Sequence, residues 1–162
     1  MQINIGYVED DEDDFVLLQD LLGEISLFEP QLQWLPGHDV ALPEMCANRH
    51  DLYLVDFRLG ARDGLQLLQD AQEGGCQVPL IMLTGQGDHE INVRSMRHGA
   101  AEYLAKSELD VRSLERAILP AVERQRARSE LDARERRARA TLAQAPLGSA
   151  HGARGGRWVR VD

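Results

Sequence analysis

The sequence has few cysteines and no long apolar run. Its two cysteines, Cys46 and Cys76, are too few and too far apart for a disulfide framework or a thiolate metal site. The longest apolar runs fall well short of the about 20 residues that a membrane-spanning helix needs. The N-terminus also lacks the basic and apolar segments of a signal peptide. We therefore expect a cytoplasmic protein with reduced cysteines and no membrane partner.

Lysine is almost absent from the chain. The 18 basic residues are 17 arginines and one lysine, Lys106. A guanidinium is planar and forked whereas an ammonium is a compact point charge, so the two do not replace each other freely in a tight site. Either chance has left this one lysine, or Lys106 occupies a site that requires an ammonium.

Positive charge is scarce in the first three quarters of the chain. Residues 1–119 carry a net charge of −14 and residues 120–162 a net charge of +5, within a total of −9. An acidic body repels phosphate, so nucleic acid is not expected as its ligand. A chain of 162 residues can build one hydrophobic core with a tail, but not two domains of ordinary size.

The stretch from Leu52 to Asp56 combines an apolar run with a terminal carboxylate. Such a run, with branched and aromatic side chains, is typical of a strand that is buried on both faces of a parallel sheet. Ligands of open α/β sheets bind at the carboxyl ends of the strands. Asp56 is therefore the candidate reactive residue.

Strands and helices are expected to alternate along the acidic part of the chain. The expected strands are residues 3–8, 31–35, 52–56, 79–84 and 102–105, and the expected helices are residues 15–25, 40–48, 65–74, 88–98 and a further one from 110. Residues 58–64 are expected to form a loop. This alternation predicts an α/β fold with a doubly wound parallel sheet. Right-handed crossovers then bring the carboxyl ends of the strands to one edge.

Four of the five expected strands end in residues that can do chemistry. Glu9 and Asp10 follow the first strand, and Asp56, Thr84 and Lys106 end or follow three others. Carboxylates gathered at one point need a cation, and oxygen ligands with room for water suit Mg²⁺. A carboxylate can attack a phosphoryl group, while a hydroxyl and an ammonium can bind its oxygens. These residues predict a site at which Asp56 accepts phosphate.

In these motifs the chain resembles the receiver domain of two-component response regulators. The resemblance covers about residues 1–120 and rests on Val8-Glu9-Asp10, Leu54-Val55-Asp56 with Gly64, Leu83-Thr84-Gly85 and Tyr103-Leu104-Ala105-Lys106. It implies a flavodoxin-like (βα)5 fold with strand order 2-1-3-4-5. It also implies phosphotransfer to Asp56 from a phosphohistidine on a sensor histidine kinase or a histidine phosphotransfer protein.

The resemblance further implies how the site is assembled. Mg²⁺ would be held by Asp10, Asp56 and the backbone carbonyl of Arg58, with Glu9 acting mainly through water. Lys106 would neutralise a phosphoryl oxygen. Apart from gaining and losing its own phosphoryl group, the domain is expected to be a signalling module and not an enzyme.

A conformational switch is a further implication of the resemblance. Thr84 and Tyr103 would reshape the face formed by the fourth helix, the fifth strand and the fifth helix, although Tyr103 also suits an ordinary strand aromatic. Arg58 and Gln86 would either flank the phosphoryl group and tune its hydrolysis or be ordinary solvated side chains. The chain departs from the family at Ser107, where most receivers have a cis proline, so the loop after Lys106 is expected to use a trans bond.

Residues 121–145 are expected to form a polar linker helix, either a solvated spacer or a weak coiled coil. Pro120 is expected to kink the helix or to end its first part. Residues 146–162 resemble the start of a PAS domain, which implies a longer regulator with an output module and a poorly ordered fragment here. A homodimer through the switch face or through the linker helix is left open.

Two rival functions fit the motifs less well. A haloacid-dehalogenase-type phosphatase also forms an aspartyl phosphate, but its Asp-x-Asp pair is missing because Phe57 and Arg58 follow Asp56. A receiver-like scaffold that binds partners without being phosphorylated would not need the intact Glu9 and Lys106.

Overall fold

The structure is a computed structural model, and it describes residues 1–85 and 88–144. The strands are β1 Gln2–Val8, β2 Glu29–Leu35, β3 Leu52–Asp56, β4 Arg58–Leu59, β5 Arg62–Asp63, β6 Leu80–Thr84 and β7 Glu102–Ala105. The helices are α1 Glu12–Gly23, α2 His38–Cys46, α3 Gly64–Glu73, α4 His89–Arg97, the 3-10 turn η1 Lys106–Glu108 and α5 Val111–Gln144. One compact unit spans Met1–Gln125, and a second begins at Arg126. The PAS-like start expected at residues 146–162 lies outside the described residues.

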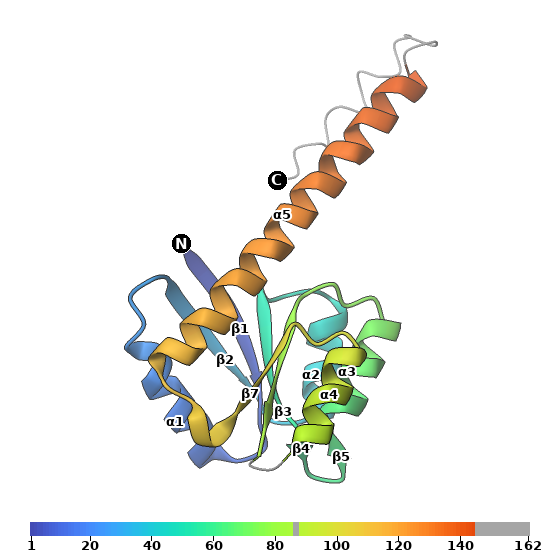
Figure 1. Cartoon of the computed structure of the whole chain (residues 1–162). Coiled ribbons are helices and arrows are strands. Elements are labelled where there is room, and N and C mark those ends of the chain that lie inside the picture. Colours follow the sequence, from blue (N-terminus) through green and yellow to red (C-terminus); the bar gives the residue numbers. More distant parts are fainter. Residues whose placement is uncertain (86–87, 145–162) are drawn as a thin grey trace. The chain divides into compact units, whose positions relative to one another are not determined.

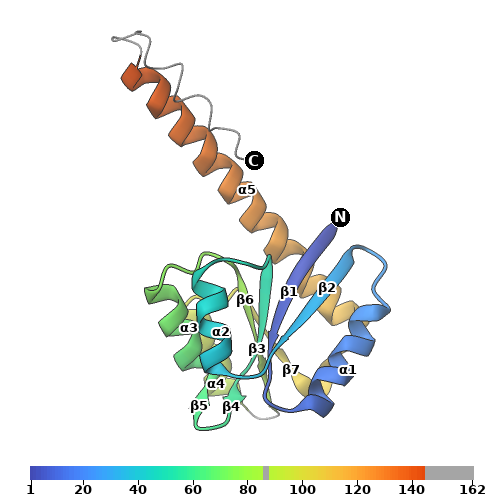
Figure 2. The ribbon, with the colours of Figure 1, turned by 180° about the vertical axis from the view of Figure 1, so that it is seen from behind.

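Five parallel strands form the main sheet in the order β2-β1-β3-β6-β7. Helix α1 and the first part of α5, up to residue 125, lie on one face, and α2, α3 and α4 lie on the other (Figures 1 and 2). Counting only these strands, the order is 2-1-3-4-5, so the expected flavodoxin-like doubly wound fold is confirmed. The carboxyl ends of β1, β3, β6 and β7 therefore meet at one edge of the sheet.

The hydrophobic core consists of two layers, one on each side of the sheet, because helices cover both faces of the central strands. Every residue of β3 and β6 is buried, as the apolar runs predict. On one side, Leu54 packs among residues of α1 and α5, including Leu18 and Ile118. On the other side, Val55 packs among residues of α2 and α3. Burying a side chain of this size contributes about 2 kcal/mol to the stability of the fold. The apolar residues of β3 therefore fix the position of Asp56 at the end of the strand.

The segment after Asp56 is a short hairpin and not the expected loop. Strands β4 and β5 pair antiparallel, Arg58 with Asp63 and Leu59 with Arg62. Gly60 lies at the turn with a φ of 66°, a conformation that glycine adopts without strain. Strands of two residues are too short to show an alternating pattern, which is why the sequence did not reveal them.

Gly64 begins α3 directly after this hairpin, in close contact with the end of β3. A Cβ atom there would lie 2.8 Å from the Asp56 carbonyl oxygen and 2.7 Å from the Met82 sulfur. Backbone cannot yield as a flexible side chain does, so only glycine allows this approach. The glycine of the receiver-like motif thus keeps α3 packed against the strand that carries Asp56.

Helix α5 starts with a capping pair, in which the Ser113 N–H donates to Asp110 Oδ1 at 2.7 Å. Of the two outcomes expected at Pro120, a kink or an end to the first part of the helix, the second is wrong, because α5 continues to Gln144. Proline removes one backbone bond, and the buried Ile118 and Val122 hold the chain on either side of it. Within the described residues, no helix combines the length and apolar character that crossing a bilayer demands.

Candidate functional site

The sheet edge gathers buried polar residues at four neighbouring strand ends. Glu9, Asp56 and Thr84 are only 1%, 7% and 0% exposed, although each is polar. Strands β1, β3 and β6 deliver them, and β7 delivers Lys106, the first residue of η1. Buried polar groups require partners, so the contacts among these residues define the site.

Lys106 is the centre of the charged cluster. Its Nζ atom lies 2.9 Å from Asp56 Oδ2, 3.0 Å from Glu9 Oε1 and 2.9 Å from Asp14 Oδ2. Burial lowers the pKa of this ammonium, but the three carboxylates outweigh burial and hold the pKa above its ordinary value. Lys106 is therefore a permanent cation, and a compact ammonium is the group that fits among three carboxylates.

Glu9 accepts hydrogen bonds from four donors, of which Lys106 is one. The Tyr7 hydroxyl donates to Glu9 Oε1 at 2.7 Å, beside Lys106, and the Asp11 N–H lies 3.3 Å from Oε2. The Trp34 indole N–H donates to the Glu9 carbonyl at 2.6 Å. Burial raises the pKa of the Tyr7 phenol, which therefore acts as a neutral donor. Burial, and then the nearby Asp56 carboxylate, raise the pKa of Glu9 from 4.5 to about 7.

This raised pKa predicts how the stability of the metal-free protein depends on pH. Between about pH 4.5 and pH 7 the folded state binds more protons at Glu9 than the unfolded state does. The contribution of Glu9 to stability is therefore largest below pH 4.5 and falls as the pH rises to 7, by at most about 1.4 kcal/mol per pH unit. Urea unfolding in a chelator at several pH values measures this slope. Glu9→Gln should flatten it, and an equally steep slope in that variant would contradict the assignment.

The carboxylates also provide the oxygen ligands of a possible cation. Oxygen atoms of Glu9, Asp14 and Asp56 lie within 4.8 Å of one another. Asp10 is exposed at the same edge, and its Oδ2 is 3.8 Å from the position of a Cβ on Gly60 in the hairpin. Hard carboxylate oxygens at this spacing suit Mg²⁺, although the cluster includes Asp14 and not the expected ligand Asp10.

Asp14 is a member of the charged cluster that the sequence analysis did not single out. It belongs to the first turn of α1, and acidic residues are common there. Its contact with Lys106, however, joins positions 92 residues apart. Asp11, in contrast, is the N-cap of α1 and accepts the Asp13 N–H at 2.9 Å. Helical periodicity alone does not separate the two roles.

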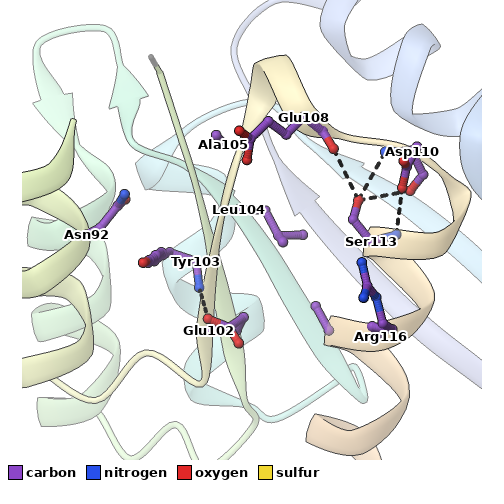
Figure 3. Close-up of a pocket in the computed structure, with 10 residues that line it drawn as sticks. Asn92, Glu102, Tyr103, Leu104, Ala105, Glu108, Asp110, Ser113 and Arg116 are labelled. Atoms are coloured by element: carbon purple, nitrogen blue, oxygen red, sulfur yellow. Dashed lines mark hydrogen bonds between the residues drawn. The ribbon is translucent and has the colours of Figure 1, made fainter. Parts of the chain in front are cut away.

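Thr84 and Tyr103 lie toward α4. The Thr84 hydroxyl donates to Asn92 Oδ1 on α4 at 2.9 Å, a partner that the sequence did not reveal. Tyr103 is half-buried and extends from β7 on the side that carries Asn92 (Figure 3). Tyr103 and Asn92 line a cavity of about 540 Å³ between α4, β7 and the start of α5. Gln86, expected to flank the phosphoryl group, lies outside the described residues.

The peptide bond between Lys106 and Ser107 is trans, as the sequence predicted. The described residues contain no cis peptide, so Lys106 and Ser107 are joined by a trans bond, and the chain turns there through η1. The ammonium reaches Asp56 without the proline that most receivers have at this position. Ser107 therefore leaves the charged cluster intact.

Comparison with known proteins identifies the fold and its family together. A family model described as the response regulator receiver domain matches residues 5–119, well over half of the chain. The chain belongs to this family. Nodulation protein W of Bradyrhizobium diazoefficiens is 35% identical to the receiver domain over 77 residues, which are 48% of this chain and 34% of that protein. Regulatory protein LuxO of Vibrio cholerae is 38% identical over 70 residues, 43% of this chain and 15% of that protein.

The chain thus spans about a third or less of these two curated relatives, at 34% and 15% of their lengths. Solved receiver domains are matched over nearly their whole length. The signal receiver domain of an HD domain-containing protein from Pseudomonas fluorescens has a TM-score of 0.67 at 25% identity, covering 78% of this chain and 99% of that one. A response regulator receiver domain protein from Clostridium thermocellum has a TM-score of 0.65 at 24% identity, covering 77% and 98%, and supports the fold.

Proposed function

We propose that this receiver domain accepts a phosphoryl group on Asp56 from a phosphohistidine of a partner kinase or phosphotransfer protein. The observation that carries the proposal is the 2.9 Å contact between Lys106 Nζ and Asp56 Oδ2 at the edge of the sheet. In the reaction, a carboxylate oxygen of Asp56 attacks phosphorus and the bond from phosphorus to the donor imidazole breaks. The ammonium of Lys106 offsets negative charge on a phosphoryl oxygen.

Mg²⁺ would be held by Asp10, Asp56 and the backbone carbonyl of Arg58, with Glu9 acting mainly through water. When bound, the metal neutralises the charge that gathers on the transferring phosphoryl oxygens. Asp56 is already oriented for this role, because its Oδ1 accepts the Arg58 N–H at 3.3 Å and its Oδ2 accepts from Lys106. The cluster of carboxylates around one ammonium has an excess of negative charge that a divalent cation would offset.

The signal would leave through the face formed by α4, β7 and α5. A phosphoryl dianion on Asp56 offers Thr84 an alternative to its bond with Asn92. Release of Asn92, with rotation of Tyr103 into the molecule, would reshape the cavity of about 540 Å³ on this face. The change would pass along α5 to an output module, for which the PAS-like residues 146–162 are the candidate start, or to a second copy of the chain.

Acetyl phosphate tests this function without knowledge of the natural donor. With Mg²⁺, intact mass spectrometry should show one added phosphoryl group, and a chelator should prevent its addition. Peptide mapping after borohydride reduction should place the group on Asp56. Beryllofluoride with Mg²⁺ should shift the amide resonances of Thr84 and Tyr103. Turnover of phosphomonoesters would indicate a phosphatase, and the absence of any Mg²⁺-dependent change would indicate a scaffold.

A further inference from the structure

A second polar cluster lies beside the β4–β5 hairpin, and sequence analysis gave its members no role. His38, the first residue of α2, is only 7% exposed. Its Nε2 lies 2.9 Å from Asp70 Oδ2 on α3, and its Nδ1 lies 2.7 Å from Arg62 Nη1 on β5. We call these three residues the His38 clamp. One imidazole thereby joins three separate elements of the fold.

The chemistry of its neighbours determines the protonation of the imidazole. A guanidinium can only donate, so Nδ1 must accept from Arg62, and the proton lies on Nε2 and is donated to Asp70. The bond from His38, followed by one from Gln66, holds the pKa of Asp70 below its ordinary value. Asp39, whose Oδ1 is 3.2 Å from Arg62 and 3.7 Å from Nδ1, balances the guanidinium. The clamp is therefore a neutral histidine held between a cation and an anion.

The hairpin that the clamp holds is attached at its base, where the Gly64 N–H donates to the Phe57 carbonyl and the Gln66 N–H donates to Asp63 Oδ1. Strands β4 and β5 contain two residues each, and a hairpin that small is at best marginally stable alone. Leu59 is buried, but a cavity of about 330 Å³ separates the hairpin from the start of α2. The bond from Arg62 to His38 spans this boundary. Loss of the bond would leave the hairpin room to move.

The hairpin is continuous with the phosphoacceptor. Arg58 begins β4 two residues after Asp56 and donates its N–H to Asp56 Oδ1. Its partner across the hairpin is Asp63, which is adjacent to Arg62. A displacement of Arg62 is therefore transmitted through one ladder pair to the backbone of Arg58. Loss of a group that orients a metal ligand from outside the coordination shell commonly lowers metal affinity about 10- to 100-fold.

We infer that His38 is a positioning residue for the phosphoacceptor site, which holds the hairpin through Arg62 and so sets the affinity of the site for Mg²⁺. The inference rests on the proposed function, because Arg58 matters to Mg²⁺ only if its carbonyl is a ligand. His38 touches neither Asp56 nor Lys106 in any contact of the described residues. Its effect is exerted through the backbone alone.

Calorimetric titration of the full chain with Mg²⁺ tests the inference. His38→Leu and Arg62→Met should each raise the dissociation constant about tenfold, and the double variant should bind no more weakly than the weaker single variant. His38→Gln, which keeps one acceptor and one donor, should recover most of the affinity. Amide exchange at residues 60–63 should accelerate in both single variants even without metal.

The matched control is His50→Leu. His50 bonds Tyr53 and Gln33 at the opposite end of β3, so its loss should lower stability without changing the affinity for Mg²⁺. If His38→Leu does not fold, Arg62→Met decides, because the Arg62 side chain is 52% exposed. Normal Mg²⁺ binding and normal exchange in Arg62→Met would overturn the role of the clamp and leave the proposed function intact. Failure of the unmodified chain to bind Mg²⁺ would instead overturn the proposed function and the inference with it.

Discussion

Asp56→Asn should abolish phosphoryl uptake from acetyl phosphate while the domain stays folded. The amide removes the nucleophilic carboxylate, yet its oxygen can still accept a hydrogen bond from Lys106, which lies 2.9 Å from Asp56 Oδ2. The affinity for Mg²⁺ should also fall by at least about tenfold, since a ligand carboxylate has become neutral. Intact mass spectrometry measures the first effect, and calorimetric titration measures the second.

Asp51→Asn is the matched control for this variant. Asp51 directly precedes β3, whereas Asp56 is its last residue. The Asp51 carboxylate accepts the Asn4 N–H at 2.8 Å, at the end of the strand that lies away from the site. The same change of chemistry there should leave phosphoryl uptake and Mg²⁺ binding unchanged. Full phosphorylation of Asp56→Asn would mean that another carboxylate is the acceptor, and Asp14 and Glu9 would be the first to examine.

The topology could be predicted because it depends on burial, which sequence patterns record directly. The run from Leu52 to Asp56 has no polar residue before its end, and only a strand covered on both faces accommodates that pattern. Parallel order then brings Asp56 and Lys106 together across 50 residues. The contact at the centre of the site thus followed from hydrophobic periodicity and the handedness of crossovers.

The polar contacts that tune the site were not predictable in the same way. Tyr7 lies in β1 and Glu9 directly follows that strand, two residues later, but the bond between them depends on how β1 meets α1. Asp14 interacts favourably with the positive end of the α1 dipole whether or not Lys106 is nearby, so its position in the sequence does not reveal the ion pair. His38 has partners 24 and 32 residues away on the β4–β5 hairpin and α3. Such side-chain networks follow from packing distances, and periodicity contains no information about them.

Lys106→Met should slow phosphorylation by acetyl phosphate about 100-fold and, at the same time, tighten the binding of Mg²⁺. The rate falls because the variant lacks the ammonium, a preorganised positive charge that stabilises the negative charge of the transition state. The affinity rises because the ammonium, which donates to Asp56 and Glu9 at 2.9 and 3.0 Å, repels a divalent cation at these carboxylates and offsets their charge. A gain of about 1.4 kcal/mol would make binding tenfold tighter.

The opposite signs of the two effects distinguish an electrostatic role of Lys106 from a merely structural one. If the side chain only supported the fold, its loss would weaken metal binding and slow phosphorylation together. Without metal, Lys106→Met should also be less stable than the unmodified chain, because three carboxylates lose their shared cation, and Mg²⁺ should restore that stability. Lys106→Arg keeps the charge but not the compact shape of the ammonium. Its rate of phosphorylation should therefore lie between the rates of Lys106→Met and the unmodified chain. Equal rates for Lys106→Arg and the unmodified chain would show that charge alone suffices, and that the single lysine of the sequence reflects chance at this position.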